Sequence, residues 1–188
     1  WSMADWWPSP EGVRVGPDGG WSVGEFRIAH LPSLRFLKAR LVFEDEGAFL
    51  VEGDRRLPVA IEGPAFEVTE LRLDPAAGEA RVVLDDGSEE VVGPDSLGTD
   101  ARTGRVECLA RGGRARAAFS RAAHQALLEH VEETRGHFFL RVGSRRLSIR
   151  AGVGAGEPSR RARKLSPSKP GSTSSASPAP TRRPSSPS

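Results

Sequence analysis

The chain has 188 residues and one cysteine, so it is long enough for one domain or two small ones and contains no internal disulfide. A single cysteine fits a reducing compartment, and we expect the cytoplasm. Residues 151–188 hold seven basic residues and one acid, whereas 1–150 hold 20 basic and 24 acidic residues, so the body has no positive excess with which to bind nucleic acid.

The first elements are a turn and a short helix. The Pro-Asp-Gly-Gly run at 17–20 predicts a tight turn just before Trp21. A helix then begins at about Pro32 or Ser33, with Ser33 as a candidate N-cap. Apolar residues recur at helical spacing through the segment 34–41, which predicts at most about three turns.

From residue 41 the apolar pattern changes to a period of two, which is typical of strands. Extended segments are expected at 41–43, 48–51, 56–61, 66–73, 80–84 and 89–92. Pro58 has no N–H to donate, so its strand lies at an edge or pairs on one side there. The Asp-Asp-Gly-Ser run at 85–88 predicts a hairpin turn.

The second part of the chain contains another helix between strands. Strands are expected at 106–110 and 114–119, joined by a glycine turn at 112–113. Ser120 is a good N-cap for a helix over about 121–135, and Gly136 is placed to end it. A last hairpin, 137–142 and 145–149, turns at 143–144.

This order of elements predicts an α+β domain at 1–150 that is rich in antiparallel strands and has two helices. Each helix precedes a set of strands, so the domain has two candidate related halves, at about 13–98 and 105–150. From about residue 151, serine and proline dominate and large apolar residues are almost absent. We expect 151–188 to be a disordered basic tail, because it cannot bury enough apolar surface to offset its ordering entropy.

Several short motifs between Val13 and Ile149 resemble the bacterial family called domain of unknown function 1285. The Asp-Gly-Gly-Trp run at 18–21 is similar to the family's opening Asp-Gly-x-Trp element. The run at 61–66, Ile-Glu-Gly-Pro-Ala-Phe, is similar to its Val-Glu-Asp-x-Pro-Phe element. Here Gly63 replaces the aspartate and the proline is shifted by one position.

The second half carries the better match. The run at 111–121 is similar to the family's Arg-x-Gly-Leu-x-Ala-x-Phe-x-Arg segment, although Arg114 stands where an apolar residue is usual. The run at 142–145 is similar to its closing Ser-Gly-Gly hairpin. The resemblance implies a mixed α+β fold with repeated motifs and no established activity, and signalling is the role that has been proposed for the family.

The sequence contains no convincing catalytic, metal or cofactor site. His124 and His130 are six residues apart, so on one helix they point in different directions and do not share a metal. Cys108 lies in an alternating strand pattern that favours burial. A nucleophilic pair of Cys108 and His124 remains an alternative.

Two features of the sequence are candidates for interaction. The adjacent tryptophans near the N-terminus form a docking element for a partner, or alternatively cover the domain's own sheet; these are Trp6 and Trp7. The basic cluster of the tail is a candidate for binding nucleic acid, anionic lipid or an acidic protein; it comprises Arg160, Arg161, Arg163 and Lys164.

These observations favour a non-enzymatic cytoplasmic module that binds a protein or a small ligand, in signalling. The alternatives are an enzyme with a dispersed site around Cys108 and His124, or nucleic-acid binding through the tail. No apolar run is long enough to span a membrane, and the N-terminal residues lack the basic and apolar regions of a signal peptide.

Overall fold

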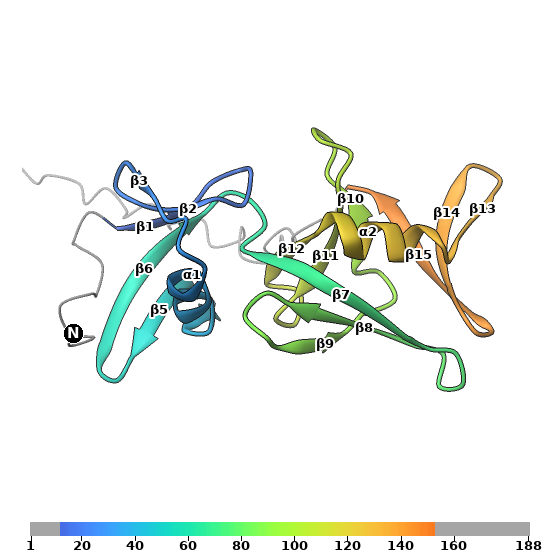
Figure 1. Ribbon diagram of the computed structural model, residues 1–188, viewed down its shortest axis with the longest axis horizontal. Coiled ribbons are helices and arrows are strands. Elements are labelled where there is room, and N and C mark those ends of the chain that lie inside the picture. The colour runs from blue at the N-terminus through green and yellow to red at the C-terminus, as the bar shows by residue number, and fades with distance from the viewer. Residues whose placement is uncertain (1–11, 153–188) are drawn as a thin grey trace, which may run out of the picture. The chain divides into compact units, whose positions relative to one another are not determined.

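The structure, a computed structural model, describes residues 12–152, and the strands in this part of the chain form two sheets (Figure 1). The first sheet has six strands in the order β3-β2-β1-β6-β5-β4. Its strands are β1 (Val13–Val15), β2 (Trp21–Val23), β3 (Phe26–Arg27), β4 (Leu41–Glu44), β5 (Gly47–Glu52) and β6 (Arg55–Ile61). Helix α1 (Leu31–Lys38) connects β3 to β4.

The second sheet has nine strands in the order β13-β14-β15-β10-β11-β12-β7-β8-β9. Its first members are β7 (Phe66–Asp74), β8 (Glu79–Leu84), β9 (Glu89–Val91), β10 (Leu97–Thr99), β11 (Val106–Ala110) and β12 (Ala115–Phe119). Helix α2 (Arg121–Leu128) follows, and the chain continues through β13 (Val131–Thr134), β14 (His137–Val142) and β15 (Arg145–Ala151). Helix α2 packs against β7 and β12.

Most neighbouring strands are antiparallel, and the exceptions are β1 with β6, β10 with β15 and β7 with β12. The mostly β architecture with two helices among residues 12–152 confirms the predicted α+β class. A single apolar cluster includes residues from both sheets, with Trp21, Phe66 and Phe119 among its largest fully buried side chains. The predicted tail, 151–188, lies outside the described residues from position 153 onward.

Most turns lie where the sequence places them. The 85–88 run joins β8 to β9 with Gly87 at φ 90°, and the 143–144 turn joins β14 to β15. Ser120 caps α2 by accepting a hydrogen bond from the Ala123 N–H. Pro58 pairs with Phe49 of β5, while pairing with β1 begins only at Val59, as a missing N–H requires.

Both helices differ from their expected bounds. Helix α1 begins at Leu31 with His30 as its N-cap residue, and the Ser33 hydroxyl bonds to the His30 ring instead of capping the helix. Helix α2 ends at Leu128, and the segment expected to continue it forms strand β13. Arg135 and Gly136, at φ 53° and 78°, make the tight turn into β14. Pairing with β14 therefore overrides the helical preference of the glutamates at 129–133.

Candidate functional site

The turn between β1 and β2 is built around Asp18. Its Oδ1 accepts a hydrogen bond from the Gly20 N–H at 2.9 Å, and its Oδ2 pairs with Arg27 Nη1 at 2.9 Å. These two contacts, the Gly20 bond first, lower the pKa of the Asp18 carboxyl. Asp18 therefore fixes the turn and also holds the Arg27 guanidinium beside it.

Glycines let this turn pack against the segment 62–65, which links β6 to β7. A Cβ on Gly19 would lie 3.0 Å from the Pro64 carbonyl oxygen, and a Cβ on Gly63 would lie 2.3 Å from the Gly16 carbonyl oxygen. Gly19 also has a φ of 82°, which favours glycine. The resemblance motifs at 18–21 and 61–66 thus lie in contact with each other.

Trp21 completes this packing. Its side chain is buried, and its Nε1 donates a hydrogen bond to the Ala65 carbonyl oxygen at 3.1 Å. This bond satisfies the indole N–H that burial would otherwise leave without a partner. The tryptophan of the motif therefore holds the 62–65 link in place.

A cavity of about 200 Å³ lies beside this contact, and we call it the junction cavity. Both sheets, α1 and the 62–65 link contribute to its lining. The polar residues that line it are Asp18, Arg27, Lys38, Glu67, Asp85 and Arg105.

The most buried cation that lines the junction cavity is Lys38, the last residue of α1. Its side chain is 7% exposed and forms an ion pair with Asp85. The other oxygen of the Asp85 carboxylate accepts a hydrogen bond from the Glu67 N–H at 3.1 Å. Lys38 Nζ also lies 5.9 Å from the centre of the Trp21 ring. A buried ammonium needs such partners, because burial of an unpaired charge is costly.

The two other cations of the cavity are far more accessible. Arg27 pairs with Asp18, and Arg105 pairs with Glu67 at 3.3 Å. The side chains of Arg27 and Arg105 are 69% and 42% exposed, and ion pairs at such exposure contribute little free energy. These two ion pairs therefore hold the guanidinium groups only weakly.

The described residues include only some of those that the sequence singled out. Trp6, Trp7 and the basic cluster 160–164 lie outside the described residues. Cys108 is fully buried, and burial, assisted by the charges of Glu90 and Glu107, raises the pKa of its thiol to about 12. Within residues 12–152, no hydrogen bond joins Cys108 to His124.

Neither a cluster of metal ligands nor a helix able to span a membrane occurs among residues 12–152. No three side chains of the His, Cys, Asp or Glu type gather there in a way that would hold a metal ion. No helix in this range has the length and apolar character needed to cross a membrane.

Sequence reasoning found only part of the junction cavity. It singled out the Asp-Gly-Gly-Trp run, but it did not select Arg27, Lys38, Asp85 or Arg105. Lys38 and Asp85 are 47 residues apart, and no local pattern pairs them. The resemblance motifs at 18–21 and 61–66, which contribute part of the lining, were the available signals.

Two solved structures match this chain in part. A DUF1285 family protein from Silicibacter pomeroyi DSS-3 aligns with 73% of this chain and 77% of its own, with 19% identity and a TM-score of 0.56. A second DUF1285 family protein, from Shewanella baltica OS155, aligns with 64% of this chain and 94% of its own, with 13% identity and a TM-score of 0.49. No family model and no curated protein matches the sequence. The resemblance to DUF1285 is confirmed in the fold by the first of these structures.

Proposed function

We propose that the chain is a divergent DUF1285-type binding module, non-enzymatic and cytoplasmic, that takes a small anionic ligand in the junction cavity as part of a signalling role. The observation that carries the proposal is the pair Arg27 and Arg105. Arg27 lies on β3 of the six-stranded sheet, and Arg105 directly precedes β11 of the nine-stranded sheet. Both guanidinium groups are partly exposed and line one cavity. A carboxylate or phosphate bound by both would be held by charge-assisted hydrogen bonds.

The size of the cavity limits the ligand. Its volume of about 200 Å³ lies below the range of about 300–1,000 Å³ that is usual for drug-sized ligands. The ligand is therefore a small anion, or the anionic end of a longer molecule. Binding to both sheets would stabilise the domain, because a ligand that binds only the folded state shifts the unfolding equilibrium.

The properties of Cys108 oppose the alternative of an enzyme at Cys108 and His124. The nucleophile in such a site is the thiolate, and a thiol with a pKa of about 12 is protonated at neutral pH. Nucleic-acid binding through 151–188 stays a separate prediction. It requires steep salt dependence and loss of binding when the tail is deleted.

We also propose that the domain contains two related halves. The strand pairing of β4, β5 and β6 recurs 90 residues later in β13, β14 and β15. The paired residues Leu41↔Leu50 correspond to Val131↔Leu140. The paired residues Leu50↔Leu57 correspond to Leu140↔Leu147. The parallel pair β1 and β6 corresponds to β10 and β15. These pairings favour halves at 13–61 and 97–151, with β7 to β9 between them, in place of the bounds 13–98 and 105–150 that we expect from the sequence.

Thermal unfolding in inorganic phosphate and in succinate, against chloride at equal ionic strength, tests the ligand site. We expect both anions to raise the Tm of the wild type, and Arg27→Gln and Arg105→Gln each to reduce that rise. Arg121→Gln is the matched control, since Arg121 is exposed and lies outside the cavity. An equal rise in all four proteins would refute the site.

A further inference from the structure

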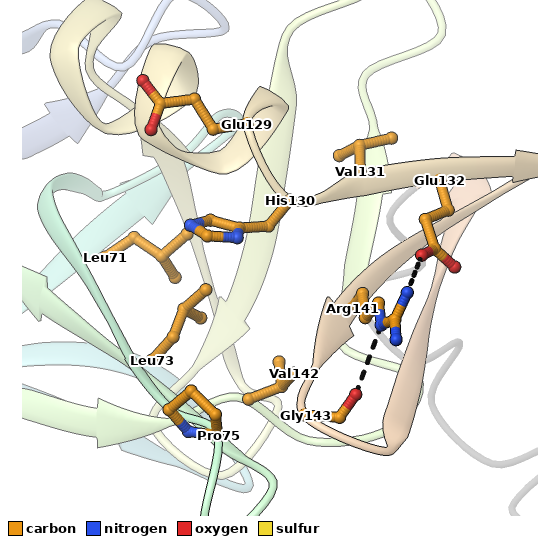
Figure 2. Close-up of a pocket in the computed structure, with 10 residues that line it drawn as sticks. All are labelled: Leu71, Leu73, Pro75, Glu129, His130, Val131, Glu132, Arg141, Val142 and Gly143. Carbon is orange, nitrogen blue, oxygen red and sulfur yellow. Dashed lines mark hydrogen bonds and ion pairs between the residues drawn. The ribbon is translucent and has the colours of Figure 1, made fainter.

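A second, larger cleft lies in the nine-stranded sheet, away from the junction cavity (Figure 2). Its volume is about 720 Å³, which lies within the usual range for a small-molecule site. One wall is the second half of β7 with Pro75, and the other is the corner between α2 and β13 with the end of β14. We call it the His130 cleft.

A bulge in β7 gives the cleft its apolar wall. The register shifts between Val68 and Glu70, and beyond this point Leu71 pairs with Val82 and Leu73 with Ala80. Val82 and Ala80 are buried, so Leu71 and Leu73 lie on the core face of the sheet. Both leucines pack against the core but are only half-buried. The apolar core therefore reaches solvent at this cleft.

His130 supplies a polar group above that wall. Its backbone is used by the fold, since its N–H bonds to the Leu127 carbonyl and its carbonyl accepts from the Arg141 N–H. Its imidazole makes no hydrogen bond to any residue in the range 12–152. Figure 2 shows the ring extending toward Leu71 from the α2–β13 corner. The ring is thus available to a ligand.

Arg141, on β14, lines the same wall of the cleft as His130. Its Nη1 pairs with Glu132 at 2.7 Å and its Nε donates to the Gly143 carbonyl oxygen at 3.3 Å. Glu132 also pairs with Arg146 at 3.5 Å, so its carboxylate is shared by two guanidinium groups. Arg141 Nη2 has no hydrogen-bond partner in the described part of the chain. Glu129, the other acid of the lining, points away from Leu73 and Pro75 (Figure 2).

We propose that the His130 cleft binds an amphipathic carboxylate, such as a medium-chain fatty acid. The apolar chain packs on Leu71, Leu73 and Val142, and the carboxylate accepts hydrogen bonds from His130 and Arg141. An apolar floor with a few placed polar groups is the usual composition of a ligand pocket. A carboxylate suits these donors, because a guanidinium group binds it through charge-assisted hydrogen bonds.

Calorimetric titration of the full chain with octanoate, octanol and octylammonium tests the proposal, because the three probes share one chain length and differ in the head group. We expect saturable binding of octanoate, about tenfold weaker binding of octanol, equivalent to about 1.4 kcal/mol, and the weakest binding for octylammonium. Equal or tighter binding of octanol or octylammonium, or no saturable binding of octanoate, would overturn the proposal.

Substitutions in the cleft test which side chains bind the carboxylate. His130→Phe and Arg141→Gln should each weaken octanoate about tenfold and leave octanol unchanged. Arg146→Gln is the matched control, since Arg146 shares Glu132 but does not line the cleft, and a much smaller effect is expected. Unchanged octanoate affinity in both His130→Phe and Arg141→Gln would remove the proposed head-group contacts.

The apolar wall and the independence of the two cavities need their own variants. Leu73→Asp should abolish binding of both octanoate and octanol, with thermal unfolding used to verify its fold. Leu73→Ala, a milder change, should weaken both probes equally. Arg27→Gln should not alter octanoate binding, because Arg27 lines the junction cavity and does not line the His130 cleft. Failure of either site is thus distinguishable from failure of the other.

Discussion

Replacing Glu107 by glutamine should stabilise the protein. Glu107 lies on β11, is 2% exposed, and its Oε2 has no hydrogen-bond partner in residues 12–152. Arg116 Nη1 is 3.4 Å from that oxygen, while Arg116 Nη2 donates to the Glu62 carbonyl oxygen at 2.9 Å. Arg116 therefore keeps a partner when the Glu107 charge is removed.

The magnitude follows from the buried charge, because the glutamine amide stays a buried polar group but carries no charge. An unsatisfied buried group costs about 1–3 kcal/mol and more when it is charged, and the lost ion pair with Arg116 offsets part of the gain, so we expect a net gain of about 1 kcal/mol at pH 7. For a domain of this size, that free energy raises the Tm by about 2–4 °C. Chemical unfolding followed by circular dichroism measures the same quantity through the midpoint and the m-value.

The pH dependence gives a second, independent check. Burial raises the pKa of Glu107 above its ordinary value of 4.5, with the charge of Arg116 opposing the shift. A carboxyl with a raised folded-state pKa contributes stability that is fully present below the unfolded pKa and is lost as pH rises through the folded pKa. The advantage of Glu107→Gln should therefore grow as pH rises from about 4.5 toward 7. A constant difference, or a net loss at pH 7, would refute this reasoning, and Glu133→Gln, at an exposed site, is the control.

Three further outcomes are expected. Gly143→Ala should destabilise the domain by more than about 1 kcal/mol in urea unfolding, because Gly143 has a φ of 59° and the added Cβ would lie 2.1 Å from the Pro75 carbonyl oxygen. Gly104→Ala is the control, and it should cost less because the space around Gly104 is open. Arg135→Asn should raise stability by about 0.5 kcal/mol, since asparagine adopts the left-handed conformation of this turn more readily, and an unchanged Tm would contradict it. Cys108 should resist a thiol reagent at pH 8 until denaturant is added, and rapid labelling of the native protein would contradict its burial.

Sequence patterns identified the local elements well. Alternating apolar residues located most strands, and the Asp-Gly turn at 85–88 and the Ser120 cap lie as expected. Helix α2 was predicted too long because the glutamates after Leu128 are good helix formers. Helix α2 ends because the residues after it pair with β14 as strand β13. That pairing depends on the turn conformation of Arg135 and on contacts with β14, which the sequence pattern of the helix segment does not contain.

The candidate sites were harder to predict, because they join distant segments. From the sequence, His130 was considered only as a metal ligand with His124, and that pairing was rejected. It was not related to Leu71 or Leu73, which are some 60 residues away in the chain. The bulge in β7 decides which side chains face the cleft, and its position depends on pairing with β8. The distribution of charged residues did not single out Arg27 or Arg105 as binding residues, since arginine is common along the whole chain.

The contact between Gly63 and the Gly16 carbonyl has a consequence for comparing this chain with its structural relatives. The resembling family motif carries aspartate where Gly63 stands, yet even a methyl group at this position would collide with the backbone of residues 16–17. A chain with aspartate here must hold that turn further from the β6–β7 link. The residue at position 63 and the residues of the turn at 16–20 are therefore expected to covary. A relative with a side chain at position 63 should also differ in the sequence of this turn.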